Sequence, residues 1–503
     1  MKHSLRIIAL LLTITFTSCN GNLNLINGIE GSGNVITEKR EITSPFTKIA
    51  VSTGIEVILE QGSNTYVEVE VDDNLMQYIV TKVEKGTLIV NQNRIEAVGK
   101  VGEVTIPADA RVYDLSGKTV MPGMVDAHAH IGAFRYGLTT QQNWQLYANL
   151  AYGVTTSHDP SSNTESIFTL SEMVKSGNLV GPRIYSTGFI LYGADGDFKA
   201  VVNNIDDARF SIKRTKAFGA LSVKSYNQPR RDQRQQVLQA AREEGINVVP
   251  EGGSNFFHNM SMVIDGHTGV EHNIPITPVY KDVLTLWGKT GVGYTPTLIV
   301  NYGGLNAEYY WYQKTKVYED KKLLQFTPRG IIDSRARFRT MAPDEEYEND
   351  HILTAKSVKA LADNGVKVNM GAHGQLQGLG AHWELWSINQ GGMSNLETLK
   401  TATINAANYI GAGKDIGSLE VGKLADILVL DKNPLEDIQN SNSLRYTIIN
   451  GRMYNADTMN EEGNEPKARK KFYWENSKYN AAFPWHEETE SFMEHHCCDA
   501  VHN

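Results

Sequence analysis

Cysteine is scarce in this chain of 503 residues, and clusters of basic side chains are missing. The three cysteines are Cys19 and the adjacent pair Cys497 and Cys498. Neighbouring cysteines can form only a strained bridge with each other, which excludes a disulfide framework. The net charge is −9 and no basic cluster stands out, which argues against nucleic acid as a partner, because phosphate binding needs grouped lysine and arginine.

A hydrophobic run long enough to span a bilayer is also missing, since the best candidate, Ile7–Phe16, is too short. Lys2 and Arg6 precede this run, and small residues and Cys19 follow it. A basic start, a short apolar core and small residues are typical of a secretory signal. The segment resembles a bacterial lipoprotein signal, which implies lipidation of Cys19 and an exported protein in the periplasm or at the cell surface. The alternatives are an ordinary signal peptide and a short membrane anchor.

What is present is 41% hydrophobic and 21% charged residues, the composition of a soluble globular protein, with a length that predicts two or three domains. Residues 20–30 are polar and read as a tether. Residues 31–90 alternate apolar with polar side chains between turn residues, a pattern that predicts short antiparallel strands. This segment, which contains GSGNVITEKREITSPFTKIAVSTGIEVILE, resembles the start of the head GIN domain of autotransporter adhesins. Its join to the rest is a natural fusion or a faulty gene join, and both stay open.

The next feature is an HxH pair at the end of an apolar strand. Val120–Val125 leads directly into His128 and His130. Alternate side chains of a strand share a face, so both imidazoles are expected to reach one point, and neutral imidazole is a good zinc ligand. The stretch VMPGMVDAHAH resembles the first-strand motif of the amidohydrolase superfamily. That resemblance implies a metal-dependent hydrolase on a (β/α)8 TIM-like barrel.

After His130, apolar runs alternate with helix-like stretches, as βαβ units require. The predicted helices include residues 206–218, 230–244, 355–364 and 396–410. The ends of barrel strands carry the chemistry, so the residues that follow each strand matter most. The predicted barrel strands are Val120–Val125, Gly153–Thr156, Pro182–Thr187, Leu221–Lys224, Ile246–Gly253, Gly269–His272, Gly293–Val300 and Val366–Gly374.

The resemblance spans residues 91–454 and is closest to imidazolonepropionase-like and prolidase-like members. Over residues 213–386 it points to exported members usually found behind a TolB-like propeller, through SVKSYNQPRRDQRQQ, VVPEGGSNFFHN and GAHGQLQGLGAHWELW. It also implies a small β-domain built from both chain ends. The expected organisation is a signal peptide (1–19), a tether (20–30), a partial head segment (31–90), a small β-domain (91–119 and 411–458), the barrel (120–410) and a polar tail (459–503).

The resemblance implies ligands for a divalent metal, one or two zinc ions. His128 and His130 match the first strand, and His272 in GVEH matches strand six. Lys224 lies where related enzymes carry a carboxylated lysine that bridges two metals. A free ammonium cannot coordinate, so this role requires carboxylation. The alternative is a lysine paired with a carboxylate.

Two positions depart from the family pattern. Strand five offers Glu251 where histidine is usual, and strand eight offers His373 where aspartate is usual. Both side chains can bind metal, so Glu251 and His373 complete the expected ligand set. The strand-eight aspartate is the usual general base, and a histidine with an ordinary pKa of about 6.5 suits base work only while it stays off the metal. His373 is therefore predicted to be either a ligand or the proton acceptor.

Several other polar and aromatic residues fall in the same loops. We expect second-shell or structural roles for His258, Asp265, His267, His382 and Glu384. The aromatic stretch 301–312 forms either a lid or substrate wall or ordinary loop packing. The tail residues His495, His496, Cys497 and Cys498 either bind a soft metal or belong to a flexible tail.

These features predict an exported metal-dependent amidohydrolase that cleaves a C–N bond other than a peptide bond, in a small amide or cyclic amide, by metal-activated water. Its expected partners are a small-molecule substrate and the membrane, the latter through a lipid on Cys19 only. One alternative is a barrel that keeps metal with weak or no catalysis. The other is a surface binding or adhesion protein defined by the head segment.

Overall fold

The computed structural model describes residues 6–8, 32, 34–41, 56–58, 66–72, 86–134, 137–193, 199–226, 228, 230–253, 255–336, 341–463 and 466–475. The predictions for Cys19, for the tether and for the tail cysteines lie outside these residues. The chain divides into two compact units, residues 1–87 with 99–106 and residues 88–98 with 107–503. Among the described residues, no helix is long and apolar enough to cross a membrane.

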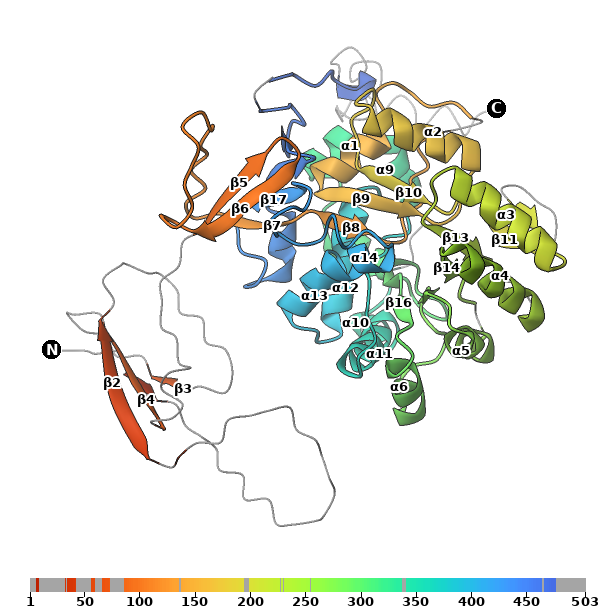
Figure 1. The fold of residues 1–503 in the computed structure, drawn as a ribbon, viewed down its shortest axis with the longest axis horizontal. Coiled ribbons are helices and arrows are strands. Elements are labelled where there is room, and N and C mark those ends of the chain that lie inside the picture. The colour runs from red at the N-terminus through yellow and green to blue at the C-terminus, as the bar shows by residue number, and fades with distance from the viewer. Residues whose placement is uncertain are drawn as a thin grey trace, which may run out of the picture. The chain divides into compact units, whose positions relative to one another are not determined.

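The first unit contains a four-stranded sheet in the order β2-β4-β1-β3 (Figure 1). Its strands are β1 (Arg6–Ile8), β2 (Val35–Glu41), β3 (Glu56–Ile58) and β4 (Tyr66–Asp72). The β2–β4 pair is antiparallel, as the alternation predicts, whereas β1 is parallel to β4.

The presence of strand β1 differs from the sequence prediction, in which residues 1–19 are a signal outside the fold. The two isoleucines of β1 belong to the apolar core of that predicted signal. Isoleucine also has a high preference for strands, so the same residues can pair with a sheet. The signal peptide itself stays a prediction.

The second unit is a mixed α/β fold with parallel strand pairs (Figure 1), and the β8–β9 pair has a register shift between Met124 and Val125. One sheet has the order β10-β9-β8, a second β12-β11-β13-β14, and a third β15-β16. The strands are β8 (Met124–Asp126), β9 (Val154–Asp159), β10 (Arg183–Ser186), β11 (Ile190–Tyr192), β12 (Lys199–Val201), β13 (Ser222–Ser225), β14 (Asn247–Pro250), β15 (Gly269–Glu271) and β16 (Gly293–Thr295).

Single backbone contacts continue this arrangement between the sheets. Parallel bridges join Glu251 to Glu271 and Tyr294 to Val368. The amide of Ala127 donates to the carbonyl of Met370 at 3.0 Å, which brings the eighth predicted strand beside the first. The hydrogen bonds among the described residues therefore link neighbouring sheets in a parallel α/β arrangement, without tracing a complete closed barrel.

Three predicted strands are much shorter than expected, and the first is Ile246–Gly253, of which only Asn247–Pro250 is strand β14. Gly293–Val300 divides into β16 and the 3-10 helix η2 (Leu298–Val300), and Val366–Gly374 holds only the bridge at Val368. Strands β11 and β12 were not predicted. The physical reason for the division of Gly293–Val300 is Thr297, whose left-handed backbone (φ 48°) ends the strand and starts the 3-10 turn.

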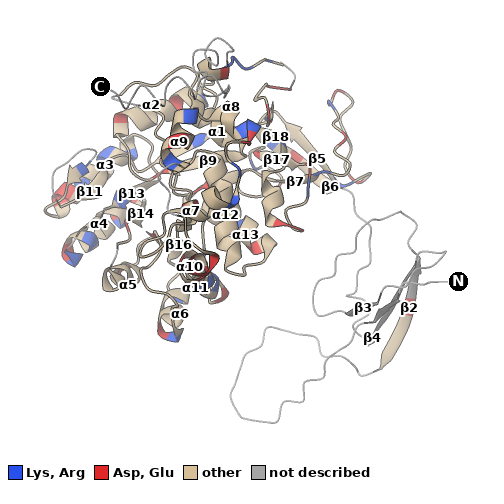
Figure 2. Cartoon of the chain, turned by 180° about the vertical axis from the view of Figure 1, so that it is seen from behind, with Lys and Arg blue, Asp and Glu red and all other residues tan. Residues whose placement is uncertain are grey.

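Helices surround the parallel strands, and the outer helices α3, α4 and α6 carry charges of both signs (Figure 2). The predicted helices 206–218 and 230–244 are confirmed as α3 and α4, and 355–364 overlaps α11, which begins earlier, at His351, and ends at Asp363. The helices are α1 (Trp144–Ala151), α2 (Thr164–Lys175), α3 (Ile205–Ala217), α4 (Arg231–Glu244), α5 (Phe256–Asp265), α6 (Lys281–Gly288), α7 (Ala307–Lys314), α8 (Lys321–Phe326), α9 (Arg329–Ala336), α10 (Asp344–Asn349), α11 (His351–Asp363), α12 (Leu379–Gln390), α13 (Asn395–Thr401) and α14 (Ile404–Tyr409), with short 3-10 turns η3 (Ile438–Asn442) and η4 (Tyr473–Glu475).

The single helix predicted over residues 396–410 is wrong, because the structure has two helices, α13 and α14, with a break between them. At the break, the carbonyl of Thr401 accepts from Met370 N at 2.9 Å and the carbonyl of Ala402 accepts from Val125 N at 2.7 Å. A continuous helix would use these carbonyls internally. The break therefore ties the chain to the first and eighth predicted strands.

Apart from the parallel sheets, the unit contains an antiparallel sheet in the order β19-β18-β17-β7, at the place of the expected small β-domain. It joins β7 (Thr119–Pro122) to β17 (Ile427–Leu430), β18 (Leu444–Ile449) and β19 (Arg452–Asn455), so both ends of the unit contribute as expected. The hairpin β5 (Gly86–Asn91) and β6 (Arg94–Lys100) also approaches this region, because Ile95 N donates to Lys423 O at 2.9 Å.

The predicted strand Val120–Val125 is divided between the two sheets at Gly123. Strand β7 pairs with β17, and β8 pairs with β9. A Cβ at Gly123 would lie 2.1 Å from the Thr155 hydroxyl, so only glycine fits at the crossing. This crossing aims the segment that follows β8, with its HxH pair, at the ends of the parallel strands.

Candidate metal centre

The structure brings the six predicted site residues to one place and arranges possible ligands in two groups that share one histidine. The first group is His128, His130 and His373, and the second is His128, Glu251 and His272. In each group the ligand atoms lie within 4.8 Å of one another. His128, Glu251 and His272 are buried, whereas His130 and His373 are half-buried.

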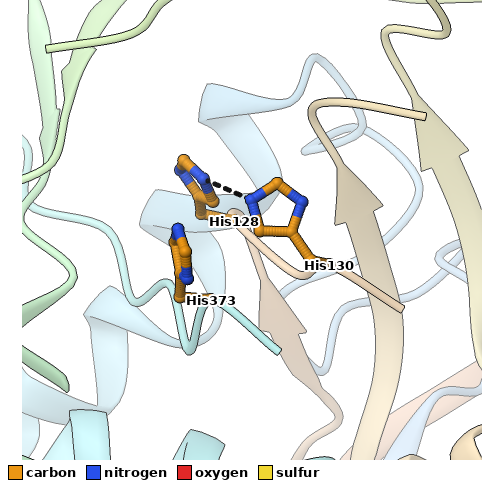
Figure 3. Close-up of side chains that lie close together, drawn as sticks. All are labelled: His128, His130 and His373. Carbon is orange, nitrogen blue, oxygen red and sulfur yellow. Dashed lines mark hydrogen bonds between the residues drawn. The ribbon is translucent and has the colours of Figure 1, made fainter. Parts of the chain in front are cut away.

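The two histidines of the HxH pair are placed so that both could bind the same metal ion. The Nε2 atoms of His128 and His130 are 3.3 Å apart, and the rings of both residues and of His373 lie close together (Figure 3). Two ligands of a tetrahedral zinc ion, with bonds of about 2.0–2.1 Å, lie about 3.3–3.4 Å apart. The spacing therefore fits a shared cation.

The second group places a carboxylate among imidazole and ammonium groups. Glu251 Oε1 lies 3.0 Å from His272 Nε2, and Glu251 Oε2 lies 2.5 Å from Lys224 Nζ. His272 Nε2 is buried and faces the carboxylate of Glu251. A buried imidazole nitrogen beside a carboxylate is a donor set that a divalent metal binds. The residues present thus fit the metal that the sequence predicts.

Lys224 is paired with a carboxylate, which is the alternative that the sequence left open. Its side chain is almost fully buried, and its partner Glu251 follows β14, the strand next to Lys224's own strand β13. A buried ammonium needs such a partner. Carboxylation of Lys224 would replace this ion pair and remains a prediction.

Two candidate ligands are oriented through their second ring nitrogen. His128 Nδ1 makes a short contact with Glu271 Oε2, and the hydroxyl of Tyr409 donates to the other oxygen of Glu271. His272 Nδ1 lies 2.6 Å from the hydroxyl of Thr297. Such outer partners hold a metal-binding histidine in one tautomer and ring orientation. When Nδ1 of His128 donates to Glu271, its Nε2 keeps the lone pair that a cation needs.

Sequence reasoning missed Glu271, although it stands next to His272. Consecutive residues of a strand point to opposite faces, so Glu271 was not expected in the same site. The structure resolves this because His272 has a left-handed backbone with φ 69°, and His373 likewise has φ 57°. Histidine adopts this conformation more readily than most residues, and such outliers cluster at functional sites.

Burial and neighbouring charges keep the imidazoles neutral. Burial lowers the pKa of His128 well below its ordinary value, and it lowers the pKa of His272 as well. Burial, followed by the nearby His130, His272 and Lys224, lowers the pKa of His373 to about 2. Neutral imidazoles are the form that coordinates metal. The same lowering makes His373 a weak base, which favours its role as a ligand.

The carboxyl groups of the site differ from each other. Burial alone would raise the pKa of Glu251, but Lys224 and His272 outweigh it and hold the pKa well below its ordinary value. Burial raises the pKa of Glu271 to about 8, and a cation at the adjacent His128 would lower it again. Glu251 is therefore the fixed negative charge of the site.

A cleft of about 440 Å³ opens over the three-histidine group and is lined by His130 and His373. Trp144, Gln145 and Arg335 are also part of its wall. The His–Glu–His group does not belong to the described lining of this cleft. Of the candidate ligands, His130 and His373 therefore face this cleft.

The remaining predicted residues have mainly structural contacts. His382 lies between Ser441 and the carbonyl of Tyr152, Asp265 pairs with Arg231, and His267 contacts the carbonyl of Met262. The Nε2 atom of His258 is buried and makes no hydrogen bond among the described residues.

Glu384 and the aromatic stretch contribute indirectly. Both oxygens of the Glu384 carboxylate accept from the backbone of η2, at Leu298 N (2.9 Å) and Ile299 N (2.8 Å), directly after Thr297. From the aromatic stretch 301–312, Tyr302 reaches the site: its ring stacks on His272 at 4.5 Å, and its hydroxyl is 3.3 Å from Glu251 Oε1. Trp311 instead packs in the interior, bonded to Ser387.

Comparison with known proteins matches two family profiles. The amidohydrolase family profile matches residues 119–454, more than half of the chain. The profile of the head GIN domain, described as an auto-transporter adhesin, matches residues 45–117. This second match begins later than the segment predicted from the sequence and extends further, into residues 91–117.

Individual relatives agree with the larger match. The ochratoxinase of Aspergillus niger is 24% identical over 371 residues, covering 64% of this chain and 72% of that protein. The imidazolonepropionase of Geobacillus sp. (strain WCH70) is 25% identical over 382 residues, covering 69% and 84%. The solved structure of a Xaa-Pro dipeptidase with bound methionine has a TM-score of 0.56 at 21% identity, covering 74% and 95% of the two chains. With the HxH pair and the strand order already in place, the profile match establishes that this chain belongs to the amidohydrolase family, with a head GIN domain at its N-terminal end.

Proposed function

We propose that the second unit is a metal-dependent hydrolase that cleaves a C–N bond in a small amide or cyclic amide. The observation that carries the proposal is the pair of ligand groups that meet at His128, one facing the cleft and one buried behind it. The family membership and the names of the relatives support C–N hydrolysis. The closed (β/α)8 barrel of this family is part of the same proposal.

His128 would bind one divalent ion through Nε2, since this nitrogen has a single lone pair, either with His130 and His373 or with Glu251 and His272. The remaining pair of side chains would hold a second ion without His128, and zinc is the expected metal. A bound ion of this kind lowers the pKa of water and polarises the substrate carbonyl. The residues themselves supply three further things. Glu271 and Thr297 orient imidazoles, the wall of the cleft positions the substrate, and Glu251 provides the negative charge.

Proton transfer is assigned to Glu251 in this proposal, with His373 as a ligand. A carboxylate has two oxygens, so Oε1, which lies beside His272 and Tyr302, can accept a proton while Oε2 stays with Lys224. His373 remains the alternative acceptor if it does not bind metal. The pKa values of both groups are lowered, so the reason for placing His373 second is that an imidazole bound to metal has no lone pair left to accept a proton.

The test combines metal analysis with a substrate panel. The purified chain is stripped with EDTA, reloaded with zinc, and assayed on N-acyl amino acids, cyclic imides, an imidazolone and Xaa-Pro dipeptides. We expect hydrolysis that disappears on stripping and returns on reloading. The dipeptides belong in the panel because relatives include both a Xaa-Pro dipeptidase and non-peptide hydrolases. Bound metal without any turnover would instead support the weakly catalytic alternative.

We also propose that the protein is an exported lipoprotein. The head GIN domain supports a bacterial surface or extracellular location. Cys19 after the short apolar run supports a lipid anchor. Labelling with a radioactive fatty acid should mark the wild-type protein and not Cys19→Ser. Equal labelling of the two proteins would rule out the anchor at this cysteine.

A further inference from the structure

The cleft beside the three-histidine group has one fixed cationic side chain in its wall. Among the described residues that line it, Arg335 is the only lysine, arginine, aspartate or glutamate. It lies on α9, far in sequence from His130 and His373, which line the same cleft. The rest of the wall includes amide and aromatic side chains, such as Gln145 and Trp144.

The guanidinium of Arg335 is held in place from behind. Its Nη1 lies 3.4 Å from Oε1 of Glu308, a carboxylate that is completely buried. The other oxygen of Glu308 accepts from Gln375 Nε2 at 2.9 Å, and Gln375 Oε1 is 3.5 Å from His373 Nδ1. A continuous series of contacts thus leads from a candidate metal ligand to Arg335.

The pairing with Glu308 does not use up the guanidinium. Arginine has five N–H donors in a planar fork, and Glu308 contacts one nitrogen. The Arg335 side chain is 30% exposed, whereas that of Glu308 is 0% exposed, so the cation and not the anion faces the cleft. A half-exposed, pre-positioned guanidinium matches a carboxylate in a two-point hydrogen-bonded pair.

We propose that Arg335 binds a carboxylate of the substrate, so that the preferred substrates are amides of carboxylic acids, such as N-acyl amino acids, rather than uncharged amides. This proposal rests on the proposed function and deepens it by naming the substrate class. A cleft of about 440 Å³ is within the range, roughly 300–1,000 Å³, that holds such small molecules. The carboxylate would lie against Arg335 while the scissile amide faces His130 and His373.

A purely structural role for Arg335 predicts a different result when this residue is replaced. If Arg335 serves only to neutralise the buried Glu308, its loss lowers stability and affects every substrate alike. A substrate-binding role affects only substrates that carry the carboxylate. The two roles are separated by a pair of substrates that differ in this charge alone.

The experiment compares N-acetyl-phenylalanine with N-acetyl-phenylalaninamide and follows acetate release by the zinc-loaded full chain. In wild type we expect the free acid to have the higher kcat/KM. In Arg335→Gln we expect kcat/KM for the acid to fall about 10- to 100-fold, mainly through KM, because a hydrogen bond to a charged group is lost. The rate on the amide should stay within about threefold, and Arg335→Lys should recover part of the loss on the acid.

Arg329→Gln on the same helix is the matched control, because Arg329 pairs with Asp333 at 3.5 Å and is not in the described lining of the cleft. It should leave the acid-to-amide preference unchanged. Equal rates on acid and amide in wild type, or equal losses on both in Arg335→Gln, would overturn the proposal while leaving hydrolysis intact. If wild type hydrolyses neither compound, calorimetric binding of N-acetyl-phenylalanine decides: binding lost in Arg335→Gln supports the site, and unchanged or absent binding overturns it.

Discussion

The two candidate ligand groups share His128 and otherwise differ in access and charge. His130 and His373 line the cleft, whereas Glu251 and His272 are buried behind them. The group that faces the cleft consists of imidazoles only, whereas the carboxylate of Glu251 lies in the buried group beside Lys224. The family resemblance implies a histidine at strand five and an aspartate at strand eight, whereas this chain has Glu251 and His373 there. In our proposal the number of ligands is therefore kept, and the negative charge lies in the buried group and not at the cleft.

The largest effect is expected from removing the residue that the two groups share. His128→Ala should abolish tight binding of zinc and lower hydrolysis by more than about 100-fold, the upper figure for losing a side chain that only orients a ligand. Metal content after dialysis and kcat/KM are the two measurements. His158→Ala is a suitable control, because His158 is buried nearby but bonds to Ala127 O and Ser222. Full zinc content in His128→Ala would mean that the shared ligand is misassigned.

The second prediction separates the groups. His373→Ala should lose about one equivalent of metal from the cleft side, and His272→Ala should lose one from the buried side, with hydrolysis reduced in both. Metal and rate are measured on the same samples. If His373→Ala keeps its metal and loses activity, His373 is the proton acceptor and the assignment to Glu251 is wrong. If metal and rate are both unchanged, His373 takes no part in the site.

A smaller effect is expected at the residue that orients His128. Glu271→Gln keeps the shape of the side chain but removes the negative charge that faces His128 Nδ1. Loss of such a partner weakens metal affinity or activity about 10- to 100-fold. Zinc affinity measured by competition with a chelator checks this. Affinity equal to wild type would show that the charge of Glu271 is not needed to orient His128.

The smallest effect concerns a histidine outside both groups. Burial lowers the pKa of His382 to about 3. The unfolded chain binds this proton below its ordinary pKa of about 6.5 and the folded chain does not, so stability is lost as the pH falls from about 6.5 towards 3. His382→Gln should remove about 2 kcal/mol of the stability difference between pH 7 and pH 5. Denaturant unfolding in EDTA measures it, with zinc-dependent activity little changed.

An unchanged pH dependence in His382→Gln would place the acid sensitivity in other groups. Asp126, Glu271 and Glu384 have pKa values raised by burial and act in the opposite direction, since they lose stability as the pH rises. The comparison between wild type and variant cancels these contributions, because they are present in both proteins.

Local sequence determined much of this fold. Amphipathic stretches predicted α3 and α4 within a residue at each end. Period-2 geometry predicted that His128 and His130 would reach one point, and they do. These features depend on neighbours in sequence, which is why sequence could predict them.

Tertiary structure alone decided the details that join distant segments. The break between α13 and α14 exists because Thr401 and Ala402 are needed by strands far away in sequence. Glu271 enters the site because the left-handed backbone of His272 turns two consecutive residues to the same place. No periodicity encodes such a turn, since it is a strained conformation that surrounding packing holds in place.

For the charges of the site, too, sequence determined the residue types and tertiary structure determined the charge states. Sequence identified Lys224, Glu251 and His373 as the positions where ligands would stand. Only the fold shows that Lys224 and Glu251 are ion-paired and that burial lowers the pKa of His373 to about 2. The physical reason is that residue type sets an ordinary pKa and a set of donor atoms. Desolvation and neighbouring charges, which come from parts of the chain brought together by folding, decide which of those atoms is charged and which is free to bind.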